Sequence, residues 1–467
     1  MNEWTITALR DAYRAGEVSP VEVVDDALAL IKQWNLHLRT YLHVSERELR
    51  RAARESERRF RFGDEIGPLD GVPVAYKDLC YIPGTPTTCG SVMFEDDPPA
   101  DAVSSVWRRL DEAGTVNMGK LNMAELAMGP TGRNKHFGDP QNPWKQGYVT
   151  GGSSSGSGCA VAGGLALAAI GTDTGGSIRL PAAFCGVVGL KPTNGRVSRH
   201  GGMPLSWTLD TFGPLTRTVA DNALVLSAIA GADPLDASAS TRPAPDYTRA
   251  LGESIAGVRV GVLEGAALGG VSGEMQTAYA EVCGALERLG ARLVAMPPPR
   301  AEELEELANT IFKYEALMIH GERLEKYEDR VTPEILMRLE AGRGVHSAEY
   351  RTALARREAL IRHYESEVFS AVDVLAGPTT PTPAPSHAQA RAEAGGLIAS
   401  LTRFTRWVNT LGAPAISLPW GFTEDGLPLA VQLVGPDFSE AALYRIAGAL
   451  EEESGGWTRS PDFKSFG

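Results

Sequence analysis

The sequence predicts an α/β protein in which a central mixed β-sheet is covered on both faces by α-helices. Short apolar runs bounded by glycine and proline alternate with longer amphipathic segments, the pattern of strands that alternate with helices. The chain has 467 residues, of which 43% are hydrophobic and 22% charged, as in a globular protein with a large core. We expect one domain over residues 1–467, with N-terminal helices at 1–65, a core at 66–230 and a variable helical insertion at 300–370.

The first elements are predicted from local signals. The segment Ser19–Glu22 combines an N-cap serine, a proline at the first helical position and a glutamate three residues after the cap. The apolar run Val72–Tyr76 follows Gly71 and predicts a buried strand. Further along, Val258–Leu263 predicts another strand, and Glu274–Leu289 predicts an amphipathic helix.

The last third of the chain begins with charged, helical segments within residues 300–370. A strand is predicted at Val372–Ala376, and the proline-rich stretch Pro378–Pro385 follows it. This stretch is either a linker or a rigid loop that lines the interior, and the sequence leaves both interpretations open. Strand-like runs at Ala415–Leu418 and Leu429–Val434 come near the end.

Charge and cysteine content exclude several classes of protein. The formal net charge is -13, so the chain repels phosphate backbones and anionic lipid, and we expect neither nucleic acid nor a membrane as a partner. The number of cysteines is odd and no two form a CxxC pair, which argues against a disulfide framework or a zinc site. We therefore expect a cytoplasmic protein without a metal or other cofactor.

Two loops rich in glycine and serine are the most informative part of the sequence. They lie at Gly151–Gly158 and Gly171–Ala182, and the small apolar residues Cys159–Ile170 between them suit a tightly packed helix and strand. A phosphate-binding loop would need a lysine followed by Ser or Thr after the glycines, which the first loop lacks. The first loop also fits G-x-S-x-G, but residues 143–150 are a poor candidate for the strand that a nucleophile elbow requires. A flexible turn would explain the first loop but not the second.

The second loop predicts a nucleophile and an oxyanion site. Two glycines, Gly175 and Gly176, precede Ser177 and leave backbone N–H groups free to point into one space. A serine hydroxyl needs a base nearby, and none of the eight histidines is a recognisable partner. Lys77, at the end of the predicted strand, could serve only if it is neutral, and burial would lower its pKa. Asp78 would oppose this unless strand alternation directs it to the other face, so spacing alone leaves the base open.

The segment Gly151–Ala182 resembles the amidase signature family at every position of the family's signature. Five flanking blocks agree with the same family: Gly71–Asp78, Gly119–Glu125, Asn142–Trp144, Gly189–Thr193 and Leu411–Ser417. The resemblance spans nearly the whole chain and is weakest over residues 230–370. It implies the amidase signature fold and a single amidase signature domain.

The resemblance also implies a Ser-cisSer-Lys triad that forms an acyl-enzyme. Ser177 would be the nucleophile, Ser153 the bridging serine held by a cis peptide, and Lys77 the base. The implied oxyanion donors are the backbone N–H groups of Thr174, Gly175, Gly176 and Ser177. Asp173 and Arg179 also match family positions, and we interpret them as supports for the loop.

The expected substrate follows from one departure from the family pattern. Glutamine-hydrolysing amidotransferase subunits carry an acidic residue just before the Val-Asn-x-x-Gly-x-Pro block, whereas this chain has Thr402 there, among large and basic residues. This favours a stand-alone hydrolase of small aryl or acyl amides. Carbamates (urethanes) present the same carbonyl centre and are further candidates. The alternatives are the glutamine-hydrolysing subunit of an amidotransferase complex, and a non-catalytic binding relative, against which the intact triad argues.

Several residues are expected to contact a small-molecule amide or carbamate substrate. The aromatic members of this set could equally be core residues, and a homodimer is left open. The expected substrate contacts are Met128, Gly129, Trp207, Phe404 and Trp407.

Overall fold

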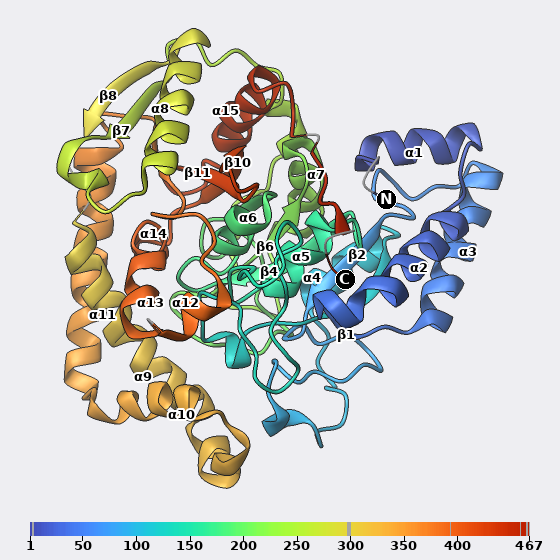
Figure 1. The fold of residues 1–467 in the computed structure, drawn as a ribbon, viewed down its shortest axis with the longest axis horizontal. Helices are drawn as coiled ribbons and strands as arrows, with labels where there is room; N and C mark the ends of the chain where they lie inside the picture. The colour runs from blue at the N-terminus through green and yellow to red at the C-terminus, as the bar shows by residue number, and fades with distance from the viewer. Residues whose placement is uncertain (2–3, 297–299, 393, 458, 464–465, 467) are drawn as a thin grey trace.

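A mixed sheet of 11 strands runs through the molecule, in the order β1-β3-β2-β4-β6-β5-β10-β11-β9-β7-β8 (Figure 1). The computed structural model describes residues 1, 4–296, 300–392, 394–457, 459–463 and 466. In this part of the chain the strands are β1 Tyr41–His43, β2 Pro73–Lys77, β3 Val116–Leu121, β4 Ala168–Asp173, β5 Val188–Lys191, β6 Thr211–Thr216, β7 Arg259–Leu263, β8 Arg292–Met296, β9 Val374–Pro378, β10 Ala415–Phe422 and β11 Pro428–Val434. Strand β2 is parallel to β3 and β4, and β7 is parallel to β8 and β9, while the other pairs are antiparallel.

Helices alternate with these strands along most of the chain. Their bounds are α1 Ile6–Ala15, α2 Pro20–Leu38, α3 Glu46–Phe62, α4 Ser105–Glu112, α5 Ser155–Ala162, α6 Arg179–Cys185, α7 Val219–Ile229, α8 Gly273–Arg288, α9 Ala301–Tyr327, α10 Pro333–Glu340, α11 Ser347–His363, α12 His387–Ala392, α13 Ala394–Thr402, α14 Arg406–Leu411 and α15 Glu440–Glu453. Figure 1 shows α1, α2 and α3 at one end of the molecule, with α9, α10 and α11 on the opposite side.

Apolar side chains fill both faces of the sheet, as the predicted fold class requires. Val74 and Tyr76 of β2 belong to one core, which also contains residues of α4, α7 and α15. Ala75, between them, belongs to a second core with residues of α2 and α5. Successive strand residues point to opposite faces, so helices cover the sheet on both sides. The predicted α/β class is confirmed.

The local signals at the start of the chain form the expected structure. Ser19 accepts a hydrogen bond from the backbone N–H of Glu22, and the Glu22 carboxylate accepts one from the N–H of Ser19. This capping box begins α2. Within the described residues, no helix combines the length and the apolar character that a membrane span would require.

The proline-rich stretch after β9 is a packed loop and not a linker. Its carbonyl groups accept hydrogen bonds from distant segments, because the Pro381 oxygen receives the N–H of Ser272 at 2.8 Å and the Pro385 oxygen receives that of Val149 at 3.0 Å. Residues 378–381 are buried. Of the two interpretations that the sequence left open, the loop lining holds.

Strand pairing brings the two serine loops to one edge of the sheet. Tyr76 of β2 is in register with Ile170 of β4, and the two strands are parallel. Lys77 therefore ends β2 beside the end of β4, which continues into the loop that carries Ser177. Helix α5 starts two residues after Ser153 and includes the beginning of the small apolar segment between the two loops.

Candidate active site

Lys77 is buried at the end of β2 with two hydroxyl neighbours. Its Nζ lies 2.7 Å from Ser153 Oγ and 2.8 Å from Thr172 Oγ1. Burial lowers the pKa of Lys77 from 10.5 to about 7, although the carboxylates of Asp210 and Asp173 act in the opposite direction. At neutral pH a large fraction of this amine is uncharged and can accept a proton.

Asp78, the neighbour of Lys77 in sequence, is directed away from it. Its carboxylate lies 3.1 Å from the Nζ of Lys120 and accepts a hydrogen bond from the N–H of Thr88 at 3.0 Å. The alternation expected from the sequence therefore separates Asp78 from the candidate base, and Lys77 keeps its lowered pKa.

Ser153 sits in a crowded loop. The peptide bond between Gly152 and Ser153 is cis. A Cβ atom on Gly152 would overlap the backbone of Gly129 and Gly132, so this position requires glycine. The two serine loops are joined directly, because the N–H of Ser154 donates to the carbonyl of Ser177 at 3.3 Å.

Ser177 is half-buried and lines a cavity of about 380 Å³. Within the described part of the chain its hydroxyl makes no hydrogen bond, so it is available to a ligand. The three residues expected to form the triad thus differ in burial, since Lys77 and Ser153 are enclosed while Ser177 lines the cavity. A serine on the cavity wall, in a loop that is hydrogen-bonded to the loop of Ser153, suits attack on a bound carbonyl.

The loop before Ser177 offers fewer free donors than the sequence predicts. The N–H of Gly176 donates to the carboxylate of Asp173 at 2.6 Å and is not free. The N–H groups of Thr174, Gly175 and Ser177 make no hydrogen bond to any described residue. Gly176 is therefore not one of the free oxyanion donors, because the carboxylate of Asp173 accepts its N–H.

Asp173 and Arg179 hold this loop in place, as expected. Their side chains are fully buried, with Arg179 Nε 3.1 Å from the carboxylate of Asp173. Arg179 also donates to the side chain of Asn409 at 2.7 Å, which connects the loop to α14. The hydroxyl of Thr405, just before α14, donates to the carbonyl of Gly175 at 2.8 Å.

The residues expected to contact substrate lie in three different cavities. Met128 and Gly129 line the cavity with Ser177. Trp207 is 50% exposed and lines a second cavity, of about 420 Å³. Phe404 and Trp407 are buried and line a third, small cavity together with residues of β7, β8, β9 and β11. For Phe404 and Trp407 the core interpretation, which the sequence left open, holds. Contact of Trp207 with substrate stays a prediction.

Helix geometry explains why Arg406 and Trp407, although adjacent in sequence, have different surroundings. Consecutive residues of a helix point about 100° apart, so Arg406 and Trp407 of α14 cannot face the same space. Arg406 lines the Ser177 cavity, whereas Trp407 packs against Tyr364 with 5.9 Å between ring centroids.

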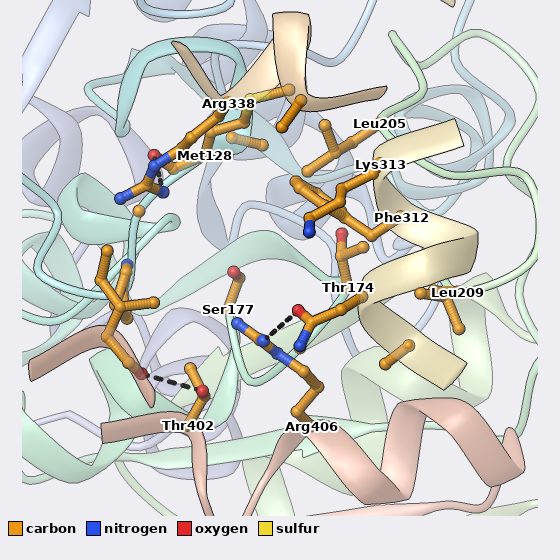
Figure 2. A pocket seen from close by; sticks show the side chains of 18 of the residues that line it. Met128, Thr174, Ser177, Leu205, Leu209, Phe312, Lys313, Arg338, Thr402 and Arg406 are labelled. Atoms are coloured by element: carbon orange, nitrogen blue, oxygen red, sulfur yellow. Dashed lines mark hydrogen bonds between the residues drawn. The ribbon is translucent and has the colours of Figure 1, made fainter. Parts of the chain in front are cut away.

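Three basic residues line the Ser177 cavity, and no sequence motif indicated them. They are Lys313 of α9, Arg338 of α10 and Arg406 of α14, and Figure 2 shows Lys313 and Arg338 on one side of Ser177 and Arg406 on the other. Two of them lie in the segment where the family resemblance is weakest, so motif matching could not identify them. Within the described residues, no group of three or more His, Cys, Asp or Glu side chains is arranged to hold a metal ion.

Comparison with known proteins identifies the family. The sequence model of the family described as Amidase matches residues 22–444. The chain belongs to the amidase signature family. A curated relative from Chloroflexus aggregans, the A-type subunit of glutamyl-tRNA(Gln) amidotransferase, is 38% identical over 481 residues, with 98% of each chain covered.

Two solved structures show how closely the fold agrees. One comes from a vestigial protein complex described as revealing the origins of an s-triazine catabolic enzyme. It has a TM-score of 0.91 and 32% identity and covers 98% of this chain and 100% of its own. The other, the peptide amidase from Stenotrophomonas maltophilia, has a TM-score of 0.86 and 29% identity, with 99% of each chain covered. The fold and family expected from the sequence are confirmed, and the chemistry of the family is amide hydrolysis.

Proposed function

We propose that this chain hydrolyses a small amide through an acyl-enzyme on Ser177. The observation that carries the proposal is the buried amine of Lys77, which lies 2.7 Å from Ser153 Oγ and has a pKa of about 7. A desolvated lysine beside a bridging hydroxyl, with an unpartnered serine on the adjoining loop, is an arrangement for activating a nucleophile.

In the proposed first step, Ser177 Oγ attacks the amide carbonyl and its proton passes through Ser153 to Lys77. The negative oxygen of the tetrahedral intermediate accepts hydrogen bonds from the free N–H groups of the loop, those of Thr174, Gly175 and Ser177. The proton returns through Ser153 to the leaving nitrogen as the C–N bond breaks. Water then attacks the ester by the same route and releases the acid and free Ser177.

Two finer functions fit this chemistry. The curated relatives are named as components of glutamyl-tRNA(Gln) amidotransferases, which supports a glutaminase that works within a complex better than the stand-alone hydrolase favoured by the sequence. The composition of the cavity supports the stand-alone hydrolase. No Asp or Glu is among the described residues that line it, so the ammonium group of glutamine would lack a carboxylate partner.

One set of assays separates these functions. The purified chain is tested on p-nitroacetanilide, an aryl carbamate and glutamine, with and without the other subunits of a bacterial amidotransferase, and Ser177→Ala is the control. Turnover of an aryl amide or carbamate by the chain alone supports the stand-alone hydrolase. Glutaminase activity that appears only with added subunits supports the role in an amidotransferase complex.

A further inference from the structure

We infer that Arg406 and Lys313 form a carboxylate-binding subsite, and that the substrate is an amide that carries a carboxylate and no ammonium group. The inference rests on the proposed function and names the substrate class of the same site. Both side chains line the cavity that contains Ser177, and they come from different helices, α14 and α9. Figure 2 shows both reaching into the space around Ser177 and Thr174.

The guanidinium of Arg406 is only partly neutralised. Its Nη1 donates to Asn309 Oδ1 at 2.7 Å and lies 3.3 Å from a carboxylate oxygen of Glu305. About a fifth of the Arg406 side chain is exposed, and burial lowers its pKa. A bound carboxylate would supply the negative charge that this cation lacks, in a geometry that a guanidinium recognises well.

Lys313 has no ion pair or hydrogen bond with any described residue. The third cation of the cavity, Arg338, differs from it. Arg338 is paired with Glu334 at 2.7 Å and donates to the carbonyl of Met128 at 3.1 Å, so its charge is already compensated. Lys313, which is exposed and unpaired among the described residues, and Arg406, which has one ion pair at 3.3 Å, are therefore the members of the set most able to bind a ligand anion.

The same surroundings disfavour an ammonium group. Thr402, which also lines the cavity, carries no charge, and its hydroxyl donates to the carbonyl of Ile398 at 2.9 Å. An α-ammonium group in this space would meet cations and no carboxylate among the described lining residues. Glutamine is thus a poorer match than the same molecule without its amino group.

The position of Arg406 limits the length of the substrate. A Cβ atom built on Gly175 would lie 3.4 Å from Arg406 Nε, so the guanidinium rests against the loop whose N–H groups would hold the oxyanion. A carboxylate bound by Arg406 is consequently close to the reacting carbonyl. We expect a short chain, as in succinamate or glutaramate, between the two groups.

The test compares monoamides of dicarboxylic acids with neutral partners of equal size. Malonamate, succinamate, glutaramate and adipamate are each assayed beside the corresponding diamide, and glutamine is assayed beside glutaramate. We expect kcat/KM for succinamate or glutaramate to exceed that of its diamide, and glutaramate to exceed glutamine, by about 10-fold or more. Diamides hydrolysed as well as the monoamides at every length would overturn the inference.

Variants separate binding from folding. Arg406→Met and Lys313→Met are expected to raise KM for the preferred monoamide by about 10-fold or more, and kcat/KM should fall far more for the monoamide than for its diamide. Arg406→Lys retains part of the preference, and Arg47→Met, at an exposed arginine, is the matched control. Equal losses on both substrates would indicate a purely structural role and contradict the subsite. If wild type hydrolyses no amide and Ser177 is not labelled by a fluorophosphonate, the proposed function fails, which is a distinct result.

Discussion

Lys77 Nζ and Ser153 Oγ lie 2.7 Å apart, and both side chains are fully enclosed by the protein. The amine lies here because β2 ends beside β4. Its neighbour in sequence, Asp78, points to the other face and forms an ion pair with Lys120. A lysine that would be charged in water is thereby held as a base within reach of a hydroxyl.

The rate should depend on pH through Lys77. Its pKa in the folded protein is about 7, and only the neutral amine can accept a proton. We expect kcat/KM to rise about tenfold per pH unit below pH 7 and to level off above it. A profile measured from pH 5 to 9 with a stable substrate tests this, and a flat profile would rule out Lys77 as the base.

Replacing Lys77 and replacing Lys120, two buried lysines on neighbouring strands, should have different effects: the first on turnover and the second on stability. Lys77→Met removes the base but leaves no unpaired charge, so we expect turnover to be lost while Tm stays within about 4 °C of wild type. Lys120→Met leaves the buried carboxylate of Asp78 without its cationic partner and should lower the free energy of unfolding by about 3 kcal/mol or more. Calorimetry and activity per folded molecule check both, and a wild-type rate in Lys77→Met would contradict the mechanism.

Thr172 is a positioning residue that the sequence motifs did not indicate. Its hydroxyl accepts the second hydrogen bond of Lys77 at 2.8 Å, an interaction that favours the charged amine. Thr172→Val should therefore move the midpoint of the pH profile to lower pH. It should also lower kcat by about tenfold, because Lys77 loses a contact that orients its amine. Thr352→Val, at an exposed threonine of α11, is the control. An unchanged midpoint together with an unchanged kcat would show that Thr172 does not act on Lys77.

The pair of Asp173 and Arg179 should be essential for stability as well as for activity. Asp173→Asn leaves the fully buried guanidinium without its counter-ion and should cost about 3–5 kcal/mol. It also weakens the acceptor of the Gly176 N–H and so loosens the oxyanion loop. Chemical denaturation measures the first effect, and a loss below about 1 kcal/mol would show that the pair is not coupled to folding.

Much of the framework was predictable because it depends on local patterns. The run Val72–Tyr76 follows a glycine and forms β2 with a shift of one residue, and Ser19–Glu22 forms the expected cap of α2. The predicted triad positions rest on an unbroken motif and stay a prediction. The base did not follow from physics alone, since a lysine at a strand end is ordinarily exposed and only the family resemblance selected Lys77.

The details that were missed depend on side-chain direction. The sequence left open whether Trp407 contacts substrate or packs in the core, and it packs in the core while the neighbouring Arg406 lines the cavity. Gly176 was expected as a free donor and is engaged by Asp173. Neither the rotation of a short helix nor the path of a carboxylate is encoded in residue spacing.

Labelling with a fluorophosphonate, followed by peptide mass spectrometry, tests the central claim most directly. We predict an adduct on Ser177 in wild type, none in Ser177→Ala, and labelling at least about 100-fold slower in Lys77→Met. An adduct on another residue, or equal labelling rates in wild type and Lys77→Met, would contradict it.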